Sequence, residues 1–168
     1  MADRIRKLLI SALAVFLSVF TIYEVNYSLL SPLKQLAVFA LIGIVLCFVI
    51  YPLDKRLEKV NWLRIVDLLL SVLFVGCCGY VLWEGDALTN QRVGQYTTSD
   101  HLVAIAATLL VLEATRRSIG WALPILASLF LLYAFYGASL PDWIFPHRGY
   151  DVDRIAAQCF LGTKGIFG

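Results

Sequence analysis

Five apolar stretches follow one another along the chain, and short charged segments separate them. Their approximate bounds are 5–23, 33–51, 62–83, 101–113 and 119–136. A helix that crosses the hydrocarbon core of a bilayer needs roughly 20 predominantly apolar residues. Four of the stretches are close to that length, and 101–113 is the shortest. The pattern predicts an all-α, polytopic membrane protein with about five transmembrane helices.

Residues at the ends of these stretches support their bounds. Pro52 follows the second stretch, and proline cannot continue the hydrogen-bond ladder of a helix. Trp62 and Trp83 flank the third stretch, and tryptophan prefers the headgroup level of a membrane. Ser99 and Asp100 are residue types that cap helix N-termini, so we expect the fourth helix to begin just after them.

Basic residues are concentrated in alternate connections. Nine of the fourteen Lys and Arg residues lie in three of these segments: Arg4, Arg6 and Lys7; Lys55, Arg56, Lys59 and Arg64; Arg116 and Arg117. Cytoplasmic loops carry an excess of Lys and Arg. We therefore expect a multi-pass protein with a cytoplasmic N-terminus and, because the number of spans is odd, a C-terminus on the outer side of the membrane. No small-residue cleavage site follows the first stretch, which we interpret as a retained span rather than a signal peptide.

The C-terminal region has a different pattern. Residues 137–150 contain two prolines and two glycines and are predicted to form a loop. Residues 151–161 then place Ile155, Ala156, Cys159 and Phe160 near one helical face, with polar residues on the other. A short amphipathic helix of this kind can lie along a membrane surface. We expect such a helix near the C-terminus.

Composition agrees with a membrane protein and excludes other classes. Hydrophobic residues make up 60% of the 168 and charged residues only 15%, whereas soluble domains are about half apolar and about a quarter charged. The net charge of +2 and the absence of a basic stripe do not support nucleic-acid binding. Three of the four cysteines lie in apolar stretches and are interpreted as small hydrophobic side chains, since no zinc spacing occurs.

Asp67 is the best candidate for a functional charge inside a span. It lies five residues into the third stretch and three residues after Arg64, which allows an i,i+3 ion pair at the membrane edge. A structural pair is one interpretation of Asp67. A role in binding a coupling ion or a substrate is the other, because ionisable groups in spans are often functional.

Glu113, Arg116 and Arg117 form a second charged group, at the end of the fourth stretch. Glutamate followed by arginine three and four residues later can pair on one helix face. One interpretation is a contact with another subunit or with anionic lipid headgroups. The other is an anchor whose long side chains extend toward the membrane interface.

No catalytic, cofactor-binding or metal-binding residue is predicted. His101 and His147 lie in outward connections without a partner at metal spacing, and we interpret both as solvated loop residues. Nucleophile-elbow, zinc-protease and phosphate-loop motifs are absent from the sequence. The spans therefore resemble a scaffold, and the chain is not expected to be an enzyme.

Two segments resemble a known transporter family. Residues 112–125, LEATRRSIGWALPI, resemble a segment of fused permeases of tripartite ATP-independent periplasmic (TRAP) transporters of the TAXI type. The tail strengthens the likeness: HRGY at 147–150, the amphipathic segment, and GTKGIFG at 162–168 are similar to the lead-in to the large transport domain of that family. The first half of the chain is similar mainly in the layout of its spans.

The resemblance implies a division of labour between two membrane domains. Residues 1–118 would be the small Q-type domain, 119–136 a linking fifth span, and 137–168 the periplasmic loop and amphipathic segment before the M-type domain. In this family the M-type domain carries sodium and small organic anions, and a periplasmic TAXI-type binding protein delivers the substrate. The resemblance therefore implies no cofactor in this chain, and three partners: the M-type domain, the binding protein and the lipid bilayer. It also implies a location in a bacterial-type inner membrane, with the C-terminus on the periplasmic side.

The outward segment 84–101 is a candidate contact for that binding protein. It is the longest outward connection and carries Tyr96 among adaptable polar residues, with Asp100 close by. The alternative is a loop that is merely solvated. A competing function of a different class is a small integral-membrane enzyme or cofactor-binding protein that uses Asp67, Glu113 or His101. That function requires polar groups converging at one depth.

Overall fold

The computed structural model describes residues 2–27, 30–51, 61–92, 95–139, 148–162 and 165–166. All the secondary structure in these residues is helical. The elements are α1 (Ala2–Tyr27), α2 (Pro32–Ile50), α3 (Asn61–Asn90), α4 (Thr98–Ile119), α5 (Ala122–Tyr136), a 3-10 turn (Gly137–Ser139), α6 (Val152–Ala156) and a π turn (Ala157–Leu161). The prediction of an all-α protein is confirmed.

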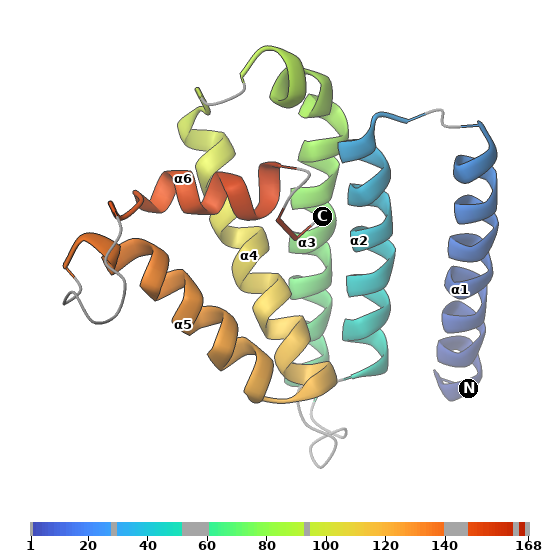
Figure 1. Ribbon diagram of the computed structural model, residues 1–168. Helices are drawn as coiled ribbons and strands as arrows, with labels where there is room; N and C mark the ends of the chain where they lie inside the picture. The colour runs from blue at the N-terminus through green and yellow to red at the C-terminus, as the bar shows by residue number, and fades with distance from the viewer. Residues whose placement is uncertain are drawn as a thin grey trace.

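The long helices alternate in direction along the chain (Figure 1). Helices α2, α3 and α4 lie side by side, and α1 flanks α2 at the edge of the bundle. Helix α5 meets α4 at a short turn and slants away from it, while α6 crosses the open side of this V. The bundle therefore has a packed middle, formed by α2 to α4, and more loosely attached flanks.

In the part of the chain that the structure describes, four helices are long and apolar enough to cross a membrane. The qualifying segments are Ile10–Tyr27, Pro32–Ile50, Ile65–Asn90 and Ala122–Ser139. Helix α4 is not among them, although its 22 residues would extend roughly 33 Å at 1.5 Å per residue. Charged side chains near both of its ends lower its hydropathy. Four of the five predicted spans are thus supported in length and composition.

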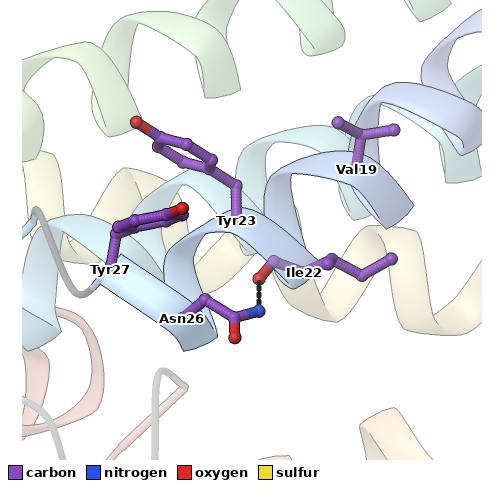
Figure 2. Close-up of a pocket in the computed structure, with 5 residues that line it drawn as sticks. All are labelled: Val19, Ile22, Tyr23, Asn26 and Tyr27. Atoms are coloured by element: carbon purple, nitrogen blue, oxygen red, sulfur yellow. Dashed lines mark hydrogen bonds between the residues drawn. The ribbon is translucent and has the colours of Figure 1, made fainter.

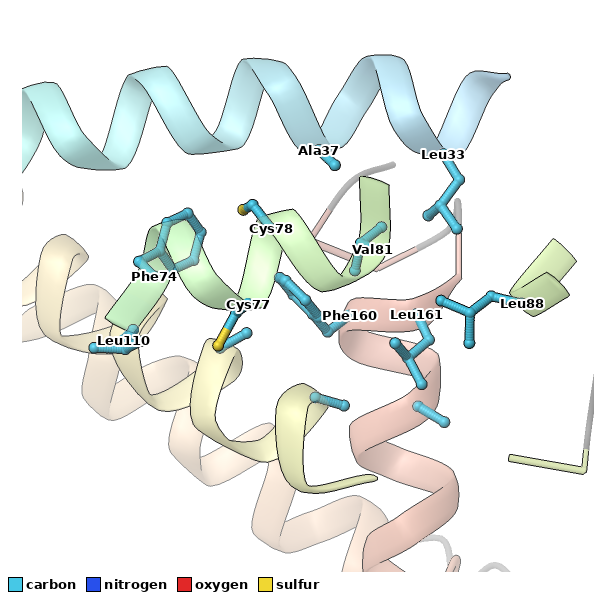
Figure 3. Packing of buried hydrophobic residues seen from close by; sticks show 13 residues of the cluster. Leu33, Ala37, Phe74, Cys77, Cys78, Val81, Leu88, Leu110, Phe160 and Leu161 are labelled. Atoms are coloured by element: carbon cyan, nitrogen blue, oxygen red, sulfur yellow. The ribbon is translucent and has the colours of Figure 1, made fainter. Parts of the chain in front are cut away.

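Small side chains allow the middle helices to approach closely. Ala37 of α2, Cys78 of α3, and Ala104 and Ala107 of α4 are all fully buried. Small residues at helix interfaces are the usual means of close packing in lipid, where dispersion contacts replace the hydrophobic effect. Figure 3 shows this cluster, with Phe74 of α3 among the larger side chains that fill the remaining space.

The connection between α3 and α4 is shorter than predicted. Helix α3 continues to Asn90 and α4 begins at Thr98, so most of the predicted outward segment 84–101 is helical. The predicted cap at Ser99–Asp100 is also wrong, by two to three residues. Thr97 is the N-cap, and its side chain accepts a hydrogen bond from the Asp100 backbone N–H in a capping box. The prediction followed the run of apolar residues only, so it left out the polar first turn of α4.

The short helix near the C-terminus occurs at the predicted residues, but its apolar face contacts the bundle and not a membrane surface. Ala157, Phe160 and Leu161 of the π turn are buried, and the Phe160 ring meets Phe74 of α3 edge to face at 6.4 Å between centroids. Its buried face thus packs into the bundle instead of lying along the membrane surface. Periodicity shows that a helix has an apolar face, but it does not show what that face contacts.

The predicted orientation leads to a labelling test. A single cysteine at Asn90 should react with an impermeant thiol reagent in intact cells, and one at Glu58 should not, because basic residues hold the second connection inside. The native cysteines are replaced first. Labelling after permeabilisation serves as the control for reactivity. The reverse pattern, with reaction at position 58 alone, would invert the topology.

Candidate functional site

Most of the described charged side chains of α3 and α4 gather in two clusters at opposite ends of this helix pair. The Arg117 cluster, where α4 meets α5, consists of Asp67, Glu113, Arg116 and Arg117. The Asp100 cluster, where α3 meets α4, consists of Tyr80, Glu84, Arg92, Thr97 and Asp100. Each cluster joins side chains of both helices, so both contribute to tertiary structure.

Arg117 is the centre of the first cluster. Its Nη1 donates to Asp67 Oδ1 at 2.6 Å, and its Nε donates to Glu113 Oε1 at 2.7 Å. Its guanidinium lies 4.9 Å from the centroid of the Phe48 ring of α2. The side chain is only 2% exposed, and its Nη2 has no hydrogen-bond partner among the described residues. Arg117 thus connects three helices and is not available to lipid or to another subunit.

The structure changes the interpretation of Asp67. We predicted a local pair with Arg64, whose side chain lies outside the described side chains. The described partner of Asp67 is Arg117, fifty residues away in sequence and on a different helix. An ion pair within the protein explains why a carboxylate can lie in this span. The structural interpretation of Asp67 therefore gains support from a tertiary contact.

Glu113 and Arg116 form the exposed edge of the same cluster. Arg116 donates from Nε and Nη2 to the two carboxylate oxygens of Glu113, at 2.7 and 2.6 Å. The Arg116 guanidinium also lies 5.0 Å from the ring centroid of Trp121, at the start of α5. Both charged side chains are about one quarter exposed. Of the predicted contact residues in this cluster, these two can still reach a lipid or a partner.

Asp100 is the centre of the second cluster. Tyr80 donates its hydroxyl proton to Asp100 Oδ1, and the Thr97 backbone N–H donates to Oδ2 at 2.8 Å. Arg92 lies 3.3 Å from Oδ2 and also donates to Glu84. Asp100 is fully buried, so the predicted role as a partner contact does not fit its position. It joins α3, the connection and the first turn of α4.

The environment of Asp100 favours its charged form. Asp100 precedes the apolar part of α4. Burial by itself would raise the pKa of this carboxyl group, but hydrogen bonds from Tyr80 and Thr97 and the charge of Arg92 lower the pKa overall. The carboxylate is therefore ionised at neutral pH and fully bonded. Such a group stabilises structure and offers no free oxygen for a ligand.

Of the remaining predicted residues, His101 lies near α6. His101 is in the first turn of α4 and not in a loop, which corrects its predicted position. Its ring packs against Tyr96 at 6.1 Å, and its Nδ1 lies 4.0 Å from Asp153 Oδ1. Tyr96 is half-buried, and its contact with a binding protein stays a prediction. His147 lies outside the described residues.

Sequence reasoning missed one buried carboxylate. Glu24 near the end of α1 is 2% exposed, and it accepts a hydrogen bond from the Leu30 backbone N–H at 2.8 Å. The signal was present, because Glu24 is the first acidic residue after a long apolar run. It satisfies the backbone just beyond the helix end. Its hydrogen bond connects the last turn of α1 to Leu30, two residues before α2 begins.

A pocket on α1 offers little to a polar ligand. Figure 2 shows its lining residues Val19, Ile22, Tyr23, Asn26 and Tyr27, all from one helix. The Asn26 amide already donates to the Ile22 carbonyl at 2.6 Å, and the two tyrosine rings pack together at 4.8 Å. Among the described residues, no three metal-ligating side chains come together.

Comparison of the chain with family models, curated proteins and solved structures finds no match.

Proposed function

We propose that this chain is the small, Q-type scaffold subunit of a sodium-coupled TRAP transporter of the TAXI type. The transporter would take up small organic anions across a bacterial inner membrane, together with a periplasmic binding protein. The observation that carries the proposal is the internal pairing of the buried charges. The choice of this transporter family is supported by the sequence resemblance at residues 112–125 and in the tail.

Among the described residues, the buried charged side chains form hydrogen bonds with other groups of the same chain. Glu24, Asp100 and Arg117 are each almost fully buried, and each is bonded within the protein. A carrier needs polar groups or exposed backbone dipoles that a solute can reach near the middle of the membrane. The described spans α1, α2, α3 and α5 are continuous helices. This arrangement supports a scaffold.

The outer helices offer apolar surface to a second membrane domain. On α5, Ile125, Leu129 and Phe130 are more than half exposed, and on α1 the same holds for Val15 and Val19. Part of this surface contacts lipid. The remainder would contact the M-type domain, for which α5 serves as the linking span.

The geometry does not favour the alternative of a membrane enzyme. An enzyme of this kind requires the polar groups that it uses, drawn from Asp67, Glu113 and His101, to lie at one depth. Asp67 and Glu113 belong to the Arg117 cluster, whereas His101 lies twelve residues before Glu113 on α4. At 1.5 Å per residue this separation is roughly 18 Å along the helix. One substrate atom could not meet all three groups.

Reconstitution tests the proposal. Liposomes that contain this chain alone, with a sodium gradient and the binding protein, are expected to show no substrate uptake. Adding the M-type domain should restore uptake, because the mobile carrier is then present. Liposomes with the M-type domain alone complete the set and should be less active than the pair. Uptake by this chain by itself would exclude a scaffold role.

A further inference from the structure

Helices α4 and α5 are joined at one end and pack incompletely along the rest of their length. Two apolar cavities of about 280 and 440 Å³ lie between them. The larger is lined by Thr115 and Leu123 near the connection, and the smaller by Ile105 and Phe135 farther from it. Among the residues of α5, all of which the structure describes, only Pro124 is buried. Contact between the two helices therefore does not by itself fix the angle between them.

The connection between α4 and α5 does not fix this angle either. It consists of Gly120 and Trp121, between Ile119 at the end of α4 and Ala122 at the start of α5. Gly120 has a φ of +101°, which L side chains rarely adopt, and a Cβ added there would meet no described atom within 4 Å beyond its chain neighbours. Because glycine has the widest choice of backbone conformations and this one lies in open space, the connection is a flexible joint.

A segment that follows α5 connects the far end of that helix to the bundle. We call residues 148–161 the tail strap; they include α6 and the π turn (Figure 1). At its beginning, the Tyr150 backbone N–H donates to the Ala134 carbonyl of α5 at 3.1 Å. Gly149 lies so close to α5 that an added Cβ would be 3.3 Å from the Phe135 carbonyl oxygen, and its φ of +72° also favours glycine. This end of the tail strap is thus docked on the last turn of α5.

The other end of the tail strap is anchored in the core. Phe160 is fully buried and meets Phe74 of α3 edge to face, and Leu161 is almost fully buried in the same cluster (Figure 3). Near the start of α6, Asp153 Oδ1 lies 4.0 Å from Nδ1 of His101 on α4. The tail strap therefore has one end on α5 and the other on the packed middle of the bundle.

We propose that the tail strap sets the angle between α4 and α5, and that releasing either of its ends lets α5 swing about the joint at Gly120. Two helices that are joined flexibly at one end have a fixed angle only if a third element bridges them. The tail strap bridges them, because it is attached to α5 at Tyr150 and to the core at Phe160. A few residues at the end of an element can absorb the backbone change of such a motion. The two attachments differ in kind, so each can be weakened separately.

The test measures distances between two spin labels by pulsed electron paramagnetic resonance in lipid nanodiscs. The labels replace Leu102 of α4 and Tyr136 of α5, which are exposed and far from the joint, and noncanonical amino acids carry them so that the native cysteines stay. Wild type should give one narrow distance distribution. Gly149→Ala should raise the population at other distances roughly five- to thirtyfold, the effect of an L residue in the left-handed conformation. Phe160→Ala leaves a cavity at the core attachment and should raise it at least as much.

Two controls separate release of the tail strap from general loosening. Gly79→Ala adds the same methyl group on α3, where an added Cβ would meet nothing within 4 Å, and should leave the distribution unchanged. Labels at Leu69 of α3 and Leu109 of α4, both exposed, report the middle of the bundle and should keep their distance in every variant. If Phe160→Ala does not fold, Phe160→Leu weakens the same attachment with a smaller loss of volume.

Three results would overturn the proposal. The first is an unchanged distribution between α4 and α5 in the variants at both ends of the tail strap. The second is a change in only one of Gly149→Ala and the Phe160 variant, which would show that the angle does not depend on both attachments. The third is an equal effect of Gly79→Ala, or a changed distance between Leu69 and Leu109, which would indicate a loss of packing throughout the bundle.

Discussion

Asp100→Ala is expected to lower the free energy of unfolding by about 3–5 kcal/mol, the usual cost of removing one partner from a buried charged network. The carboxylate is fully buried and accepts hydrogen bonds from Tyr80 and Thr97 as well as lying against Arg92. Its loss leaves buried donors without an acceptor and removes half of the capping box of α4. Unfolding is measured in detergent micelles by circular dichroism during titration with a denaturing detergent.

Asp86→Ala is the matched control for this substitution. Asp86 pairs with Lys34, but its side chain is 68% exposed. Exposed ion pairs contribute between about 0 and 1 kcal/mol. The two aspartates lie near the same end of the bundle, so a general effect of lost negative charge would affect both variants alike. Equal destabilisation would show that burial of Asp100 is not what makes it important.

Arg117→Ala is expected to separate α4 from α3 at the opposite end of the bundle. The substitution leaves Asp67 without its described partner and removes the guanidinium from the Phe48 ring. Because the arginine is almost fully buried, we expect a loss of about 3–5 kcal/mol. The yield of folded protein by size-exclusion chromatography and the unfolding midpoint both report this loss.

Two variants test whether the position of Arg117 is what matters. Arg116→Ala removes the same charge from a partly exposed side chain and should cost no more than about 1 kcal/mol. Asp67→Asn keeps an oxygen that can accept from Arg117, so transport by the assembled system should stay within a few-fold of wild type. Complete loss of sodium-coupled uptake in Asp67→Asn, with normal assembly, would instead assign Asp67 to the coupling machinery.

Hydropathy was sufficient to predict the five long helices, because long apolar runs leave few other structures possible in a membrane. It did not predict where α3 ends or where α4 begins. Hydropathy also could not predict which charged side chains form ion pairs. The i,i+3 spacing suggested Arg64 as the partner of Asp67, whereas the contact with Arg117 depends on how α3 and α4 pack. The pairing of Glu113 with Arg116 and Arg117 was predictable, because these residues share one turn of one helix.

The region around Asp100 shows a second limit of sequence reasoning. Aspartate at a helix start suggests an N-cap, but Thr97 fits that role here and Asp100 completes the capping box from N3. The extra hydrogen bond from Tyr80 could not be foreseen, since that residue lies twenty positions earlier and on another helix. Local capping signals thus identified the right turn and assigned the wrong role to the residue.

The docking of Phe160 has a consequence for the order in which this protein is assembled. Its site is formed by residues of α3 and α4 and does not exist until these two helices have paired. A chain synthesised from its N-terminus completes both helices before the tail emerges, so the tail docks last. If α3 and α4 are mispaired, Phe160 and Leu161 remain outside the bundle as exposed apolar side chains.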